Sequence, residues 1–217
     1  MHAPSSYDKI KICMGKRDYK IIGQDGYFHI YNRGNNFQNI FLDDEDYETF
    51  LLKLKQNLFP DGSAKRTIPL PGGSYSLLSY CLMPNHFNFL LRQNKKYAPN
   101  ALLLRLCTSY SKYFNRKYKR TGHLFQDKYK SVNIEDDEQL LWLHAYINLN
   151  PIIDKHAENI DKYRWTSYHE MLGGTEGFCD KSFIFERLKD SLEIKKFFED
   201  ALPVLKINKK LREFKFE

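Results

Sequence analysis

Residues 74–92 read SYSLLSYCLMPNHFNFLLR, and this stretch decides the fold. Its apolar runs predict two strands, at about 74–82 and 86–92, separated by Pro84, which cannot donate a hydrogen bond to a β-ladder. Residues 26–32, GYFHIYN, alternate in polarity and predict a further strand. We therefore expect an antiparallel sheet that contains all of these segments.

The strand at 86–92 has two different faces. Because side chains alternate along a strand, Phe87, Phe89 and Leu91 point to one side, toward a core. His86 and Asn88 point together to the other side. An imidazole nitrogen beside an amide oxygen can hold a divalent cation. On its own, however, such a pair on a strand is more often simple polar surface.

Three helices are predicted around these strands. Asp43 or Asp44 can cap the first helix, whose apolar residues recur at helical spacing. The second helix spans about 98–119. The third begins among four acidic residues, where the helix dipole favours them, and is expected to end at Asn150 because Pro151 follows. The connecting segments are a turn at 33–36, a Pro/Gly-rich loop at 59–73, and a loop or edge strand at 123–133.

The order β-α-β-β-α-(β)-α is that of a ferredoxin-like fold, in the α+β class. We expect an antiparallel sheet with helices packed on one face, which leaves the other face free for a ligand. Residues 1–20 read as a basic N-terminal arm and 21–170 as the main domain. Residues 171–217 read as a mostly helical C-terminal extension with a basic tail.

The positive charge is concentrated in one part of the chain. The 217 residues include 34 Lys and Arg against 27 Asp and Glu, a net charge of +7. Residues 92–130, the basic segment, hold eleven basic residues and one acid, so the rest of the chain is slightly acidic. The basic segment also holds seven aromatic residues. Cations interleaved with aromatic rings suit nucleic acid, since the cations meet phosphates and the rings can stack on unpaired bases.

Composition excludes several other classes of protein. No apolar run is long enough to span a bilayer, and no apolar signal core is present near residue 1, so neither a membrane span nor a secretory signal is expected. The four cysteines are scattered without a Cys-x-x-Cys pair. Neither a zinc ribbon nor a disulfide scaffold is therefore expected, and a reducing cytoplasm fits.

The third helix carries a second candidate for chemistry. Tyr146 and Asn150 are four residues apart and so share one helix face. A tyrosine can act as a nucleophile toward phosphorus if a polarised phosphate or a nearby base compensates for its ordinary pKa of about 10. The alternative is packing, because the chain has fifteen tyrosines and most of them must be structural or surface residues.

Both candidates lie in motifs of one family. Residues 83–92, MPNHFNFLLR, resemble the metal motif of the single-tyrosine HUH transposases, and residues 146–151, YINLNP, resemble their nucleophile helix. Three further segments match in order: residues 31–34, 122–131 and 163–168. Together these motifs resemble the REP-associated tyrosine transposase branch of the IS200-like transposases, over about residues 25–170.

The resemblance implies a metal-dependent transposase that cleaves and rejoins single-stranded DNA near hairpins. It implies that Tyr146 attacks the phosphodiester to leave a 5′-phosphotyrosine, and that His86, Asn88 and Asn150 hold Mg²⁺ or Mn²⁺. The residues that would bind hairpin DNA are Arg33, Gly34, Arg105, Lys112, Arg116, Lys119, Arg120, His123, Lys128, Tyr129 and Lys130. The expected protein is bacterial, cytoplasmic and nucleoid-associated, without membrane contact, and either a monomer or a homodimer.

The chain departs from the family pattern at one position. Asn88 stands where the family has its second histidine. Asparagine still offers a carbonyl oxygen, which hard Mg²⁺ prefers, but it is a neutral and weak donor. Three interpretations stay open: an active enzyme with a shifted metal preference, a weak enzyme, or a domesticated hairpin-binding protein. An RNA-binding protein with a stacking sheet is disfavoured, because His86 and Asn88 take the place of exposed aromatic residues.

Overall fold

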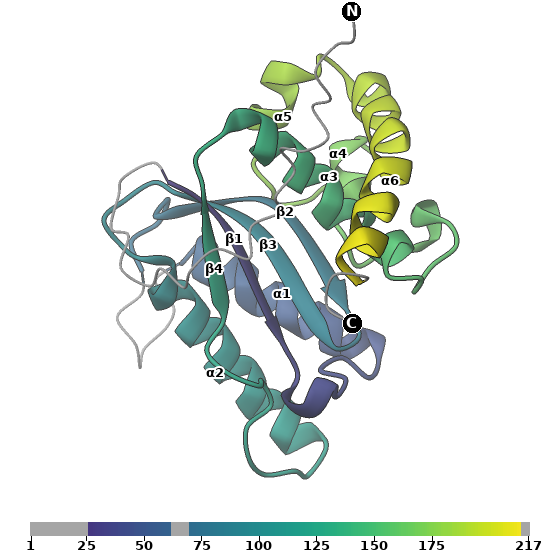
Figure 1. Cartoon of the computed structure of the whole chain (residues 1–217). Helices are drawn as coiled ribbons and strands as arrows, with labels where there is room; N and C mark the ends of the chain where they lie inside the picture. Colours follow the sequence, from purple (N-terminus) through teal and green to yellow (C-terminus); the bar gives the residue numbers. More distant parts are fainter. Residues whose placement is uncertain (1–25, 62–69, 214–217) are drawn as a thin grey trace, which may run out of the picture.

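The computed structural model describes residues 26–61 and 70–213 (Figure 1). The expected basic arm at 1–20 lies outside the described residues, as does most of the Pro/Gly-rich loop. The strands and the first three α-helices follow one another in the predicted order, β-α-β-β-α-β-α. None of the described helices is both long and apolar enough to cross a membrane.

Four strands form one antiparallel sheet. They are β1 (Tyr27–Arg33), β2 (Tyr75–Met83), β3 (His86–Gln93) and β4 (Lys130–Ile134). The order across the sheet is β2-β3-β1-β4, and every neighbouring pair is antiparallel. This is the ferredoxin-like arrangement, so the predicted fold class is confirmed. The segment at 123–133, predicted to be a loop or an edge strand, contains most of β4. Among the described strands, β4 pairs only with β1, so it is an edge strand.

Two helices cover the first face of the sheet. They are α1 (Asp44–Leu58) and α2 (Pro99–Lys117). The side chain of Asp43 accepts a hydrogen bond from the Asp46 amide and so caps α1, as predicted. Phe87 and Phe89 of β3 pack against Phe50 of α1, and these buried rings belong to the largest core cluster.

The second face is not left entirely free, which corrects the expectation that helices pack on one face only. Helix α3 (Asp137–Ile153) lies against β2, β3 and β4 on that face. Leu143 and Ile147 of α3 share a buried cluster there with Leu78 and Leu90 of the sheet. The physical reason is that this face also carries apolar side chains, and an apolar helix stripe buries them.

Pro151 does not end α3, contrary to the prediction. The helix continues to Ile153, and the Asp154 amide donates to the carbonyl of Asn150. A proline in a helix loses one backbone hydrogen bond and clashes with the preceding turn. Here Ile152 and Ile153 are both buried after it, so their packing offsets that cost over the short remainder of the helix.

The C-terminal residues pack on the outer side of α3. They include α4 (Tyr168–Met171), α5 (Ser182–Arg187) and the long α6 (Ser191–Glu213). Helix α6 runs beside α3 (Figure 1), and Phe198 and Leu205 share a third buried cluster with Leu149. Helix α3 is therefore held between the sheet and α6.

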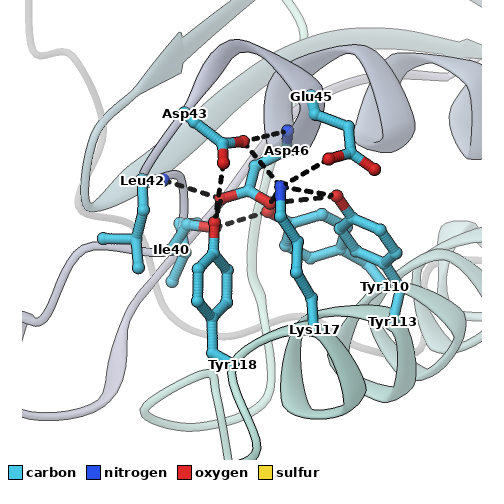
Figure 2. A network of polar contacts seen from close by, with 9 residues as sticks. All are labelled: Ile40, Leu42, Asp43, Glu45, Asp46, Tyr110, Tyr113, Lys117 and Tyr118. Atoms are coloured by element: carbon cyan, nitrogen blue, oxygen red, sulfur yellow. Dashed lines mark hydrogen bonds and ion pairs between the residues drawn. The ribbon is translucent and has the colours of Figure 1, made fainter.

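Part of the basic segment serves the fold. Figure 2 shows Lys117, near the end of α2, among the carboxylates at the start of α1. Its Nζ lies 2.7 Å from Asp43, 2.9 Å from Glu45 and 3.1 Å from Asp46. The Tyr118 hydroxyl donates to Asp46 at 2.8 Å. Lys117 and Tyr118 thus join two helices instead of presenting a free charge and ring to a ligand.

Candidate active site

Strand β3 and helix α3 bring the predicted site residues together. His86 and Asn88 project from the second face of β3, and Asn150 reaches them from α3. His86 Nε2 lies 3.2 Å from Asn150 Oδ1, and Asn88 Nδ2 donates to the same oxygen at 3.5 Å. Tyr146, one helical turn before Asn150, lines one cavity with His86 and Asn88. The four residues therefore lie on the same face of the sheet.

The two contacts of His86 indicate which ring nitrogen carries the proton and which is free to bind a cation. Nδ1 lies 2.7 Å from Asn85 Oδ1, and Nε2 lies 3.2 Å from Asn150 Oδ1. Burial lowers the pKa of His86 from 6.5, against the opposing field of Asp154. A neutral imidazole has one N–H, which we assign to the shorter contact. The lone pair of Nε2 then faces the oxygen of Asn150.

This pair fits the divalent cation that the resemblance implies. Two ligands at 2.1 Å from an octahedral Mg²⁺ lie about 3 Å apart, close to the observed separation of nitrogen and oxygen. Among residues 26–61 and 70–213, no group of three His, Cys, Asp or Glu side chains could hold a metal. The donors are thus one imidazole and amide oxygens, which suits a hard cation that takes its other ligands from water and phosphate.

The structure adds a residue that the sequence did not single out. His29 of β1 points to the same face, and its Nε2 donates to Asn88 Oδ1 at 3.0 Å. Its ring stacks on Tyr31 at 4.9 Å and meets Tyr146 edge-on at 6.5 Å. Burial lowers the pKa of His29 to about 4, so the ring is neutral. The sequence GYFHIYN does contain a sign of this: His29 and Tyr31 are two positions apart on a strand, so their side chains point to the same face.

A cavity of about 610 Å³ opens over these residues. Three of the predicted DNA-binding residues, Arg33, Lys128 and Lys130, line it. Lys209 of α6 also lines it and forms an ion pair with Asp154 at 2.7 Å. The cavity therefore combines a polar floor with a rim of cations, which suits a phosphate group.

A second cavity of about 820 Å³ lies between α2 and the 122–129 loop. Lys112, His123 and Tyr129 line it, and Lys128 lines both cavities. The loop is thus a shared wall between the two. Tyr129 is only 7% exposed, so little of its ring is available for stacking on a base.

The remaining predicted DNA-binding residues line neither cavity. Arg105, Arg116 and Lys119 lie elsewhere on or after α2. Arg120 donates to Asn115 and to Gln38, which is a structural role. Gly34 is buried, and a Cβ there would lie 2.1 Å from the Gln38 carbonyl oxygen, so this glycine permits a close backbone approach.

Comparison with known proteins gives a match to a family model over part of the chain, and a similar fold. Residues 72–150 match the family model described as "Transposase IS200 like". The sequence matches none of the curated proteins compared with it.

Two solved structures are similar. One is a REP-associated tyrosine transposase bound to a REP hairpin, with a TM-score of 0.54 and 13% identity over 78% of this chain and 96% of that chain. The other is a putative transposase from Deinococcus radiodurans, with a TM-score of 0.40 and 12% identity over 68% of this chain and 98% of that chain. The resemblance found in the motifs is thus confirmed: in residues 72–150 the chain is similar to the IS200-like transposases, and its fold is that of a REP-associated tyrosine transposase.

Proposed function

We propose that this protein is a transposase that cleaves and rejoins single-stranded DNA near hairpins, with Tyr146 as the nucleophile and Mg²⁺ or Mn²⁺ as cofactor. The observation that carries the proposal is the meeting of Tyr146, His86 and Asn88 in one cation-rimmed cavity, with Asn150 against the floor. The match to IS200-like transposases supports the same reaction class.

In the proposed reaction the Tyr146 oxygen attacks the scissile phosphorus. A bond forms between the phenolic oxygen and phosphorus, and the bond from phosphorus to the 3′-oxygen breaks. The phenol loses its proton, the 3′-oxygen gains one, and the 5′-phosphotyrosine conserves the bond energy for rejoining. A bound divalent cation would polarise the phosphate. His86 and Asn150 would hold that cation, and Asn88 would join them through its oxygen.

We further propose a path for the DNA. Arg33 and Lys130 would bind phosphates beside the scissile bond, and Lys112 and His123 would hold the strand in the second cavity. Lys128 lines both cavities and would guide the strand between them. The similar REP-associated transposase was solved with a REP hairpin, which supports a hairpin beside the cut. A DNA substrate would place the protein at the bacterial nucleoid in the cytoplasm, as a monomer or a homodimer.

The test is a covalent adduct on a denaturing gel. The protein is incubated with hairpin-containing single-stranded DNA, labelled 3′ of the candidate cut, and with Mn²⁺ or Mg²⁺. We expect an adduct that disappears in Tyr146→Phe and persists in Tyr97→Phe, a matched change at an exposed tyrosine outside both cavities. An adduct that survives Tyr146→Phe would reject Tyr146 as the nucleophile.

A second candidate function is hairpin binding without cleavage. The orientation of Asn88 favours it, because its nitrogen, and not its oxygen, faces Asn150. An amide nitrogen does not ligate Mg²⁺, so the metal site as it stands lacks one ligand. Tight hairpin binding with no adduct, for any metal and hairpin tested, would establish this alternative.

A further inference from the structure

We propose that His29 is a positioning residue that holds the Asn88 amide in place and allows it to turn its oxygen toward the cation, and that it thereby compensates for the imidazole missing at position 88. The inference rests on the proposed function, because it concerns how the same cation would be held. It adds a residue from a different strand, β1, to a site otherwise built from β3 and α3.

The register of the sheet places the two side chains against each other. Tyr31 of β1 pairs with Asn88 of β3, so His29 is the diagonal neighbour of Asn88 on the same face. His29 is 6% exposed and Asn88 is 4% exposed. Their 3.0 Å hydrogen bond is therefore almost completely shielded from water, and either group would be costly to leave unpaired.

The direction of this hydrogen bond decides which atom Asn88 presents to the cavity. In the structure Oδ1 accepts from His29, and Nδ2 therefore points to Asn150 Oδ1. A rotation of the amide by 180° would instead turn Oδ1 toward Asn150 Oδ1, which His86 Nε2 also contacts, so that the three residues could together hold a cation. Nδ2 would then face His29 and need an acceptor there.

A neutral imidazole satisfies both orientations. Nε2 can donate to the amide oxygen, or it can accept from the amide nitrogen when the proton sits on Nδ1. An aliphatic side chain could do neither, and a lysine could only donate. The ring is also held in place, since it stacks on Tyr31 and meets the edge of Tyr146. His29 is thus suited to support Asn88 in the cation-bound orientation as well as in the one observed.

The test measures Mn²⁺ affinity without DNA, by the loss of the free-ion electron paramagnetic resonance signal. The variants are His29→Leu, Asn88→Ala and the double variant, with His169→Leu as an imidazole removed outside the cavity. We expect His29→Leu to weaken Mn²⁺ binding about tenfold or more, the usual effect of removing a residue that orients a ligand. In the Asn88→Ala background the same change should have no further effect. His169→Leu should match the wild type.

Two results would overturn the inference. One is an unchanged Mn²⁺ affinity in His29→Leu, and the other is an equal further loss when His29→Leu is added to Asn88→Ala, which would make His29 a direct ligand. Should His29→Leu fail to fold, His29→Gln keeps a donor and an acceptor and should retain part of the affinity. If the wild type binds Mn²⁺ no better than His86→Ala does, the cation site of the proposed function is itself rejected, independently of the role of His29.

Discussion

At the residue scale, the chemistry of the cavity depends on what Asn88 can offer. It is buried, bonded on one side to His29 and on the other to Asn150. As a neutral amide it is a weaker electron donor than an imidazole nitrogen, although its carbonyl oxygen is of the kind that suits Mg²⁺ and Mn²⁺. The cavity is otherwise supplied with a candidate nucleophile and cations, so under the proposed function position 88 would set its metal affinity.

Asn88→His is expected to strengthen Mn²⁺ binding by about tenfold, or 1.4 kcal/mol, and to raise the yield of the covalent adduct. The reason is that an imidazole replaces a weak amide donor beside Asn150 Oδ1, the same atom that His86 Nε2 contacts. The Mn²⁺ titration and the adduct assay, run on the wild type and on Asn88→His, measure these two effects. An unchanged affinity would show that position 88 does not face the cation.

Lowering the pH should destabilise the protein through His144. Both of its ring nitrogens are buried without a hydrogen-bond partner in the described part of the chain, and burial lowers its pKa to about 3. The unfolded chain binds a proton near pH 6.5 and the folded chain does not. The free energy of unfolding is therefore highest above pH 6.5. It falls as the pH is lowered, and at pH 5 this group has reduced it by about 2 kcal/mol.

His144→Phe isolates this contribution. We expect the variant to lose about 2 kcal/mol less than the wild type between pH 7.5 and pH 5. It should also be more stable by about 1 kcal/mol at pH 7.5, because two unpaired polar atoms leave the core. Urea unfolding at the two pH values measures both effects. An equal loss in the two proteins would assign the pH dependence to other groups.

At the scale of elements, polar contacts join the start of α1 to the end of α2. Asp46 is fully buried and is bound by Lys117 and by the Tyr113 and Tyr118 hydroxyls. Burying a carboxylate is costly unless it is paired and hydrogen-bonded. The network of Figure 2 supplies this pairing, and it holds α2 beside the core that supports β3.

Lys117→Met should destabilise the protein by about 2–4 kcal/mol, because the buried Asp46 would lose its cationic partner. Lys112→Met, an exposed lysine on the same helix, is the matched control and should change stability by less than about 0.5 kcal/mol. Urea unfolding at pH 7 measures both. Equal midpoints for the two variants would mean that the two hydroxyl groups and the Leu42 amide support Asp46 without the cation.

At the scale of the whole molecule, the C-terminal extension contributes to the cavity of the proposed site. Lys209 of α6 reaches Asp154, which follows α3, and both line the cavity beside His86. The carboxylate is thereby neutralised at a place where it would otherwise attract a cation. Helix α6 thus both packs α3 in place and adjusts the charge of the cavity.

Lys209→Met should therefore strengthen Mn²⁺ binding about fivefold, or 1 kcal/mol, because the charge of Asp154 is released toward the cavity. Lys206→Met, an exposed lysine one turn earlier on α6, is the control and should leave the affinity unchanged. The electron paramagnetic resonance titration measures both. A weaker binding in Lys209→Met would show that Lys209 supports the site in another way.

The local parts of the fold could be predicted because local patterns encode them. The alternation of apolar and polar residues predicts β1 and β3. Asp43 predicts the start of α1, and apolar residues at helical spacing predict α3. The end of α3 was misplaced, since burial of the residues after Pro151 overrides the preference of proline. The basic segment was interpreted as a stacking surface, yet its tyrosine at position 110 is fully buried in the core.

The sequence alone determined the order of the elements, the fold class and the identity of His86, Asn88, Tyr146 and Asn150 as a candidate site. The order and the fold class depend on residue type and on spacing within single strands and helices, whereas the resemblance to the IS200-like transposases is what joins the four residues into one candidate site. Only the tertiary structure decided that α3 covers the second face and that His29 meets Asn88. That contact joins residues 59 positions apart. It depends on which strands pair and in which register, and no local pattern of residues carries that information.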